Sequence, residues 1–422
     1  MAVDRENLDG IRREVAAWLD EHWDPNRSLA EWRDILFQGR WAAPGWPEEY
    51  YGRAYSSAQV AAVEEVFREK KAIGAAAGGP GTLARGIILA EGSEEQKRTY
   101  LKPLLTGEHK WCQLFSEPGS GSDLAGLSTK AERVDGHYLI NGQKVWTTSA
   151  HHADFGLLLA RTDWDVPKHQ GISYFLLNMR QSGVEVRPLK QMNGYASFNE
   201  VFLNDARVDS RDMVGQPGDG WRLATTTLSF ERQQFVATAQ MLDRYPDEKG
   251  AIYIEYRDEL DDLLRPYVWY PQRAGRVDLV LPRARETGAI SDPVIRQEIA
   301  RLICLDKATE ALIAAAEEYA SSGADKVVPA GSIGKLARSE ISRQAAHVHT
   351  HISGMGAVLA GAEAPQQGLV AEVLLSSPAM SIAGGTDEIQ KNIIAERVLG
   401  LPKEARSDTG PFRDVPRNLV SR

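Results

Sequence analysis

The sequence predicts an α+β protein, in which a helical N-terminal region precedes a middle antiparallel β domain and a helical C-terminal region. Apolar residues recur at three- and four-residue steps before residue 110 and again after residue 220, which is typical of amphipathic helices. Between them, short strand-like segments are separated by Asp-Gly and Asn-Gly pairs, which are strong hairpin signals. The length of 422 residues allows two or three domains.

The N-terminal domain is expected over residues 1–112. Ile11, Val15 and Leu19 lie on one face of a first amphipathic helix. A second helical pattern covers residues 58–73, and the segment starting at Ser93 begins a further helix with a capping arrangement.

The middle β domain is expected over residues 113–213. Three strands are predicted at its start, joined by turns at Asp135-Gly136 and Asn141-Gly142. Four further strand patterns follow, separated by polar turns, and the last ends near Met213.

The C-terminal domain is expected over residues 214–422. Its helical patterns cover residues 223–242, 293–319, 333–351 and 386–399. Residues 244–279 look like an insertion rich in Tyr and Trp, either a partner surface or lid or, more simply, a surface excursion packed on its own aromatic rings. The polar tail after Pro402 is expected to fray.

Composition excludes several classes of function. A net charge of −9 argues against nucleic acid or an anionic membrane as the main partner. The two cysteines, Cys112 and Cys304, indicate a reducing compartment. No apolar run is expected to span a membrane, and the early acidic residues do not fit a signal or transit peptide. We therefore expect a cytosolic protein.

The most informative segment is Trp111–Gly126, with the sequence WCQLFSEPGSGSDLAG. Its Gly and Pro residues break a helix, so it should run from a strand end into a tight loop. Exposed backbone N–H groups and Ser hydroxyls suit a phosphate or the edge of a heteroaromatic ring. A second segment, KVWTTS at residues 144–149, follows two predicted turns later.

These two segments resemble the flavin- and substrate-binding signature of the acyl-CoA dehydrogenase family. The resemblance covers nearly the whole chain except residues 244–279. It implies FAD as cofactor and the acyl-CoA dehydrogenase fold, with a C-terminal four-helix bundle. It also implies oxidation of an acyl-CoA to a trans-2-enoyl-CoA, with electrons passed to an electron-transfer flavoprotein.

The resemblance also implies roles for single residues. The start of the loop would meet the isoalloxazine, Ser122 would lie nearer the pyrophosphate and the pantetheine of the substrate, Trp146 would pack on the ring, and Thr148 would hydrogen-bond near N5. Thr386 and Glu388 match positions that contact the flavin chain, although an N-cap role for Thr386 is equally compatible. The implied cofactor-binding set is Gln113, Phe115, Ser116, Gly121, Ser122, Trp146, Thr148, Thr386 and Glu388.

The catalytic base is displaced relative to many family members. Their base is a Glu just before a Gly-Thr pair, where this chain has Gly384. A second family pattern places the base on the long helix after the β domain, beside an Arg, and LSFERQQF matches it with Glu231 and Arg232. The resemblance thus implies Glu231 as base and Arg232 as a structural or substrate-binding neighbour, and the Gly384 N–H could polarise the thioester carbonyl.

Two motifs that homotetrameric members give to a neighbouring subunit are altered. Neither the Arg nor the Phe-Gly of one motif is in place in ARETGAISDPVIRQ, and the other has become Thr350–Gly356. Either a paralogous chain supplies the missing half-site, which we favour slightly, or a homomer binds FAD with altered contacts. A flavin-dependent oxidase or monooxygenase acting on a non-CoA substrate, or a non-catalytic subunit, remains the alternative.

The histidines give no metal prediction. His151 and His152 are adjacent, so they should point to opposite faces if they lie on a strand. His347, His349 and His351 alternate on a predicted helix and should spread around it. We interpret all five as structural or surface residues.

Overall fold

The structure is a computed structural model that describes residues 2–76, 78–241, 245–321, 330–405 and 408–415. Side chains are described for these residues except 2–6, 231–241, 317–321 and 330. The chain divides into two compact units. The first comprises Met1–Leu189, Ser197–Pro266 and Asp408–Arg422, and the second comprises Lys190–Ala196 and Tyr267–Ser407.

Four helices of the first unit share one core: α1 (Ala2–His22), α2 (Leu29–Gln38), α3 (Ser57–Glu69) and α7 (Ala251–Leu264). Trp32 is completely buried there and donates from Nε1 to the carbonyl of Ile73 at 2.6 Å. Tyr253 and Tyr256 of α7 are buried in the same core. The expectation that the inserted aromatic residues pack only on one another is therefore wrong for these two tyrosines.

A mixed sheet forms the centre of the first unit, in the order β6-β7-β3-β2-β4-β5-β8, with β1 beside β4. Its strands are β1 (Trp111–Leu114), β2 (Lys130–Val134), β3 (His137–Thr148), β4 (Phe155–Arg161), β5 (Ile172–Asn178), β6 (Val184–Leu189), β7 (Phe198–Asp209) and β8 (Met213–Val214). Most neighbours are antiparallel, as predicted, but β1 runs parallel to β4.

One predicted turn is confirmed and the other is wrong. Val134 pairs with His137 across Asp135-Gly136, both of which have positive φ, so this pair closes a two-residue hairpin. At Asn141-Gly142 the strand continues, with an irregularity in its pairing with β7. A Cβ on Gly142 would lie 2.5 Å from the Thr129 hydroxyl, so the glycine serves close approach to Thr129 and not a turn.

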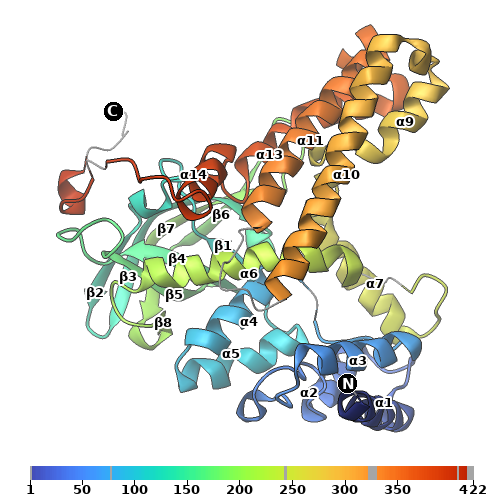
Figure 1. Cartoon of the computed structure of the whole chain (residues 1–422). Coiled ribbons are helices and arrows are strands. Elements are labelled where there is room, and N and C mark those ends of the chain that lie inside the picture. Colours follow the sequence, from blue (N-terminus) through green and yellow to red (C-terminus); the bar gives the residue numbers. More distant parts are fainter. Residues whose placement is uncertain (1, 77, 242–244, 322–329, 406–407, 416–422) are drawn as a thin grey trace. The chain divides into compact units, whose positions relative to one another are not determined.

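Three helices pack against the sheet: α4 (Gly79–Glu91), α5 (Glu94–Thr106) and α6 (Gly220–Met241). Figure 1 shows α6 lying across the strands. Its residues Leu223 and Ala224 are fully buried in a core that also contains Ile87 of α4 and Leu157 of β4. The predicted capping arrangement at Ser93 is confirmed as a full capping box with Gln96 at the start of α5.

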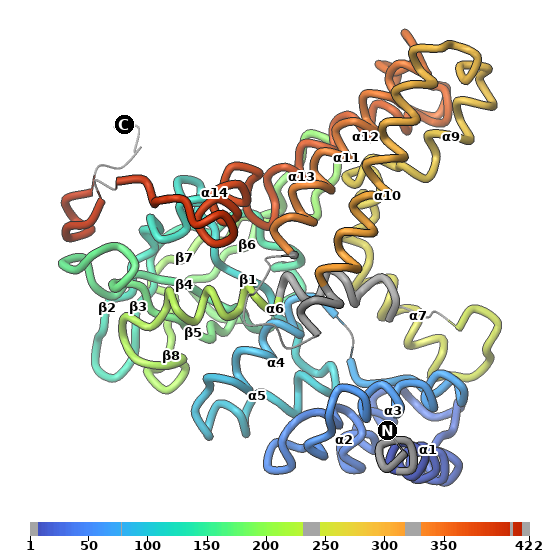
Figure 2. Tube along the Cα trace, viewed as in Figure 1, coloured from blue at the N-terminus to red at the C-terminus, as the bar shows by residue number. Residues whose placement is uncertain are grey.

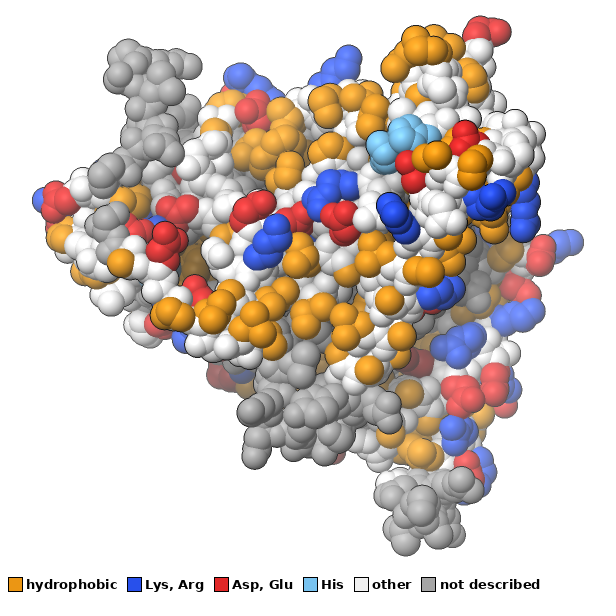
Figure 3. Space-filling view, turned by 45° about the horizontal axis from the view of Figure 1, so that its top comes forward, with side chains coloured by type: hydrophobic (Ala, Val, Ile, Leu, Met, Phe, Trp, Pro, Cys, Tyr) orange, Lys and Arg blue, Asp and Glu red, His pale blue; other side chains and the backbone are white. Residues whose placement is uncertain are grey.

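The second unit is helical. Its α-helices are α8 (Tyr270–Arg273), α9 (Val277–Glu286), α10 (Pro293–Ser321), α11 (Ala330–Ser353), α12 (Leu369–Ser376), α13 (Pro378–Ile382) and α14 (Asp387–Arg397). Figure 2 follows α10 and α11 side by side, and Ile299, Leu302, Ile341 and Val348 fill the core that they share with α9. Acidic and basic side chains are mixed over the face shown in Figure 3.

One stretch of this unit, Pro365–Arg397, is apolar and long enough by composition to cross a membrane, contrary to the sequence expectation. Such a single stretch is weak evidence, because core helices pass the same test. In the structure the stretch is interrupted: Ala383 is extended, and Gly384 and Gly385 both have positive φ. No uninterrupted helix within it approaches the roughly 20 residues that a bilayer requires.

The tail is ordered over residues 408–415, so the expectation that it frays is wrong there. The Phe412 side chain is 1% exposed. Its N–H donates to the carbonyl of Val166 at 3.0 Å, and the N–H of Arg413 donates to the carbonyl of Trp164 at 3.0 Å. The tail thereby packs on the connection between β4 and β5 of the first unit.

Candidate active site

The predicted flavin loop begins with a tight reverse turn after β1. Glu117 and Ser120 exchange two backbone hydrogen bonds, both of 3.0 Å. Pro118 sits at the position of a β-turn where its fixed φ is favourable. The Ser120 hydroxyl donates to the carbonyl of Asp123 at 2.6 Å, so this serine shapes the loop itself. Gly121 and Ser122 follow and are exposed.

A buried ion pair holds the start of this loop. Lys144 Nζ lies 2.8 Å from Glu117 Oε1 and also donates to the carbonyl of Phe115. The same carboxylate accepts from the backbone N–H groups of Ser128 and Thr129, at 2.7 and 2.9 Å. Burial alone would raise the pKa of Glu117, but the charge of Lys144 and these hydrogen bonds prevail and lower the pKa to about 2.

Arg161, at the end of β4, fastens the far end of the loop. Its side chain is completely buried, and its three nitrogens donate to the carbonyls of Ala125, Leu127 and Lys168 at 2.7 to 3.1 Å. The ring of Phe412 covers the guanidinium, with its centroid 3.4 Å from Cζ. The C-terminal tail is therefore part of the support of the loop.

Trp146 occupies a bulge in β3, where the pairing with β7 shifts between Lys144 and Thr147. Its φ is +61°, which is rare for a bulky residue, and its side chain is 57% exposed. Phe198 contacts the indole edge-on. Bulges re-aim side chains beside functional sites, and here the bulge presents an aromatic face to the outside of the sheet.

The structure brings the predicted ring-binding segments together. The Val145 N–H donates to the carbonyl of Ser116 at 3.0 Å, so the start of the loop lies beside the strand that carries Trp146 and Thr148. Ser116, Thr148 and Gln113 are half-buried. Phe115 differs, since its side chain is buried edge-on to Tyr174 and only its main chain is left for a cofactor.

These residues fit a flat heteroaromatic cofactor. The exposed indole of Trp146 provides a wall, and the half-buried residues Ser116 and Thr148 provide hydroxyl groups. Cβ positions at Gly119 and Gly121 would meet no atom within 4 Å, so the loop leaves room for a ring.

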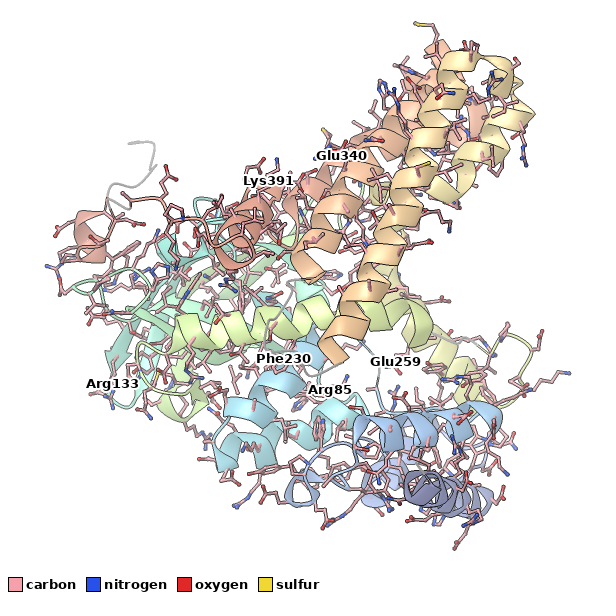
Figure 4. All side chains as sticks on the ribbon, in the orientation of Figure 1. Arg85, Arg133, Phe230, Glu259, Glu340 and Lys391 are labelled. Carbon is pink, nitrogen blue, oxygen red and sulfur yellow. The ribbon has the colours of Figure 1, made fainter. Side chains whose placement is uncertain are left out.

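The predicted base lies on α6. The side chains of Glu231 and Arg232 are outside the described part of the structure, so their roles stay predictions. The preceding residue, Phe230, packs against α4, where a Cβ on Gly86 would lie 2.8 Å from the Phe230 ring. Figure 4 labels Phe230 and also Arg85, which lies on α4. Burial lowers the pKa of the Arg85 guanidinium to about 10.

The remaining predicted residues belong to the second unit. Gly384 has φ +70°, and its carbonyl accepts from Gln390 Nε2 at 3.0 Å. Thr386 is the N-cap of α14, since its hydroxyl accepts from the Ile389 N–H at 3.3 Å. Glu388, in the first turn, is exposed.

Sequence reasoning missed the buried charges of this unit. Asp387 is buried and accepts from Lys335 at 2.9 Å and from Arg343 at 2.6 Å. Arg283, which directly precedes the altered segment ARETGAISDPVIRQ, is buried and donates to His349 Nδ1 and to the Ser353 hydroxyl, at 2.5 and 2.6 Å. It therefore serves the interior of its own chain.

The fold and the flavin loop define the class of this protein as a flavin-dependent dehydrogenase. The models of the acyl-CoA dehydrogenase N-terminal, middle and C-terminal domains match residues 6–108, 112–206 and 275–399. The chain belongs to the acyl-CoA dehydrogenase family, and its cofactor is FAD.

Named relatives agree with this membership. Acyl-CoA dehydrogenase IpdE1 of Mycolicibacterium smegmatis is 35% identical over 89% of this chain and 88% of its own length. Acyl-CoA dehydrogenase FadE34 of Mycobacterium tuberculosis is 35% identical over 96% of this chain, which spans only 50% of FadE34. Among solved structures, the ChsE4-ChsE5 complex from Mycobacterium tuberculosis matches with a TM-score of 0.59 and 23% identity, over 94% of this chain and 98% of that one.

The histidine expectations need correction. His151 and His152 lie in a short 3-10 helix, η3 (Ala150–His152), and their ring centroids are 4.0 Å apart, so they do not point to opposite faces of a strand. On α11, His349 is buried, whereas His347 and His351 share the outer face with ring centroids 4.1 Å apart. The i,i+4 spacing was the signal that could have found this pair.

Proposed function

We propose that the chain catalyses the α,β-dehydrogenation of an acyl-CoA thioester to a trans-2-enoyl-CoA, with electrons passed on to an electron-transfer flavoprotein. The observation that carries the proposal is the outward-facing Trp146, held on a bulge beside the loop that starts at Ser116. Bound FAD supplies the hydride acceptor. Around it, Trp146 would hold the ring and Thr148 would stabilise charge near its reactive edge.

The proton chemistry in this proposal rests on α6. Glu231 takes the α-proton as the general base. The N–H of Gly384 polarises the thioester carbonyl, a task that needs no side chain. Gly384 has a φ of +70°, at which a Glu would be strained, so the backbone here suits a glycine better than a carboxylate-bearing residue.

Anaerobic bleaching of the flavin by a panel of acyl-CoAs tests the proposal. We expect bleaching by at least one thioester, and a rate about 10²- to 10⁴-fold lower in Glu231→Gln, because the general base is removed. Glu310→Gln, an exposed change on α10, should leave the rate unchanged. Unimpaired bleaching in Glu231→Gln would show that another residue is the base. No bleaching by any thioester, with fast reoxidation of reduced flavin by oxygen, would favour an oxidase or monooxygenase instead.

We also propose that a paralogous chain completes the FAD site. The segment ARETGAISDPVIRQ contains neither the Arg nor the Phe-Gly of the partner motif, and Arg283 just before it donates to His349 and Ser353 of its own chain. The ratio of FAD to protein in the chain purified alone, before and after mixing with a candidate paralogue, tests this. A full complement of tightly bound FAD and turnover by the chain alone would contradict it.

A further inference from the structure

We propose that Glu298, His347 and His351 form a binding site for a divalent transition metal, best suited to Zn²⁺, that joins α10 to α11. Among the residues that the structure describes, they are the one group of three possible ligands close enough to share an ion, with ligand atoms all within 4.8 Å of one another. The group takes no part in the proposed flavin chemistry.

The geometry is close to that of a metal site. His347 and His351 are one helical turn apart on α11, a spacing that places two imidazoles on one face, as in helical zinc motifs. Glu298 of α10 reaches them from the neighbouring helix, with Oε2 2.9 Å from His351 Nδ1 and Oε1 3.9 Å from His347 Nε2. A tetrahedral Zn²⁺ with bonds of about 2.0–2.1 Å holds its ligand atoms roughly 3.3 Å apart.

The chemistry of the ligands fits as well. Two imidazoles and one carboxylate are a common set for Zn²⁺, and water can take the fourth position. The His347 and His351 side chains are 63% and 41% exposed, so an ion can enter from solvent. Histidine side chains are visible together in pale blue, with acidic side chains beside them, on the face shown in Figure 3.

A bound ion would fix the last two turns of α11 against the start of α10. This end of α11 leads into η7 (Gly354–Val358), which contains part of the altered partner motif. Metal binding would therefore hold the start of η7 in place, independently of catalysis.

Calorimetric titration of chelator-treated, FAD-loaded protein with ZnCl2 tests the site. We expect one high-affinity Zn²⁺ per chain, and affinity at least about tenfold lower in His347→Ala and in His351→Ala. The double variant His151→Ala/His152→Ala, which removes the close histidine pair of the first unit, should bind as the wild type does. Unchanged affinity in the α11 variants, or loss in the control, would overturn the proposal.

Two further measurements separate metal binding from a simple exposed ion pair. Zn²⁺ should raise the melting temperature of the wild type and of Glu310→Gln, but not that of His347→Ala or His351→Ala, because only a ligand of the folded state stabilises it. Co²⁺ should give the visible absorption of a tetrahedral complex only when both histidines are present. If neither signal appears in the wild type, the cluster is an ion pair and the proposal is wrong.

Discussion

Lys144 and Glu117 form an ion pair beneath the flavin loop, 2.8 Å from Nζ to Oε1, with the Lys144 side chain completely buried. β3 contributes the cation, and the turn after β1 contributes the carboxylate. The pair thus joins the two segments that carry the predicted ring-binding residues, and it fixes the start of the glycine- and serine-rich loop against β3.

Glu117→Gln should destabilise the first unit by about 3–5 kcal/mol, because it leaves the ammonium of Lys144 buried without its counter-charge. Urea unfolding measures the loss. Glu132→Gln, which removes an exposed partner of Lys130, should cost less than about 1 kcal/mol. Replacing both members, as Glu117→Gln/Lys144→Met, should recover part of the loss, and equal effects of the buried and the exposed change would refute this account.

Arg161→Lys should weaken FAD binding by about tenfold or more. A single ammonium cannot satisfy the three carbonyls that the guanidinium binds, and each buried carbonyl left unsatisfied costs about 1–3 kcal/mol. The flavin-to-protein ratio after dialysis reports the effect. Arg133→Lys, at the exposed position on β2 labelled in Figure 4, is the matched control and should keep its flavin.

The second unit should lose stability as the pH falls from about 6.5 towards 4. Burial, with a smaller effect of the nearby Arg283 cation, lowers the pKa of His349 from 6.5 to about 4. In this window the unfolded chain binds the proton and the folded chain does not, so stability rises with pH, by about 3 kcal/mol in total.

Hydrogen exchange in α9 and α11, corrected for the intrinsic rate, checks this pH dependence. Protection in the wild type should fall between pH 7 and pH 5, and His349→Gln should flatten the dependence, although it lowers protection at pH 7. An identical pH profile in the two proteins would assign the titration to another group.

Gly384→Ala should destabilise the second unit by about 1–2 kcal/mol, because a non-glycine residue is strained at φ +70°. A Cβ would meet no atom within 4 Å, so crowding does not contribute. Gly74→Ala is a control without positive φ and with equal space. Differential scanning calorimetry compares the two variants, and a Gly384→Ala protein as stable as the wild type would argue that the backbone relaxes freely here.

Much of the architecture could be predicted because it rests on periodic signals. The four-residue spacing of Ile11, Val15 and Leu19 and the capping sequence at Ser93 are local signals, and the structure contains the helices that they predict. Asn141-Gly142 shows the limit of such signals. The same dipeptide serves a hairpin or a bulge, and only the distant partner Thr129 decides which.

The site could be predicted less completely, because its support is formed by charges distant in sequence. Nothing local indicates that Lys144 meets Glu117 or that Arg161 binds the carbonyls of Ala125 and Leu127. A charged residue within an apolar strand was the available hint. The Phe412 position was missed for a similar reason, since a single aromatic residue in a polar tail carries no periodicity.

The docked tail has a consequence for synthesis of the protein. Phe412 covers the guanidinium of Arg161, and more than 200 residues of chain separate them. During translation the sheet can pair long before residue 412 leaves the ribosome, so the support of the flavin loop is complete only after Phe412 has been synthesised. Contacts so distant in sequence form late, and a nascent chain arrested before residue 412 should hold its sheet but not a finished cofactor site.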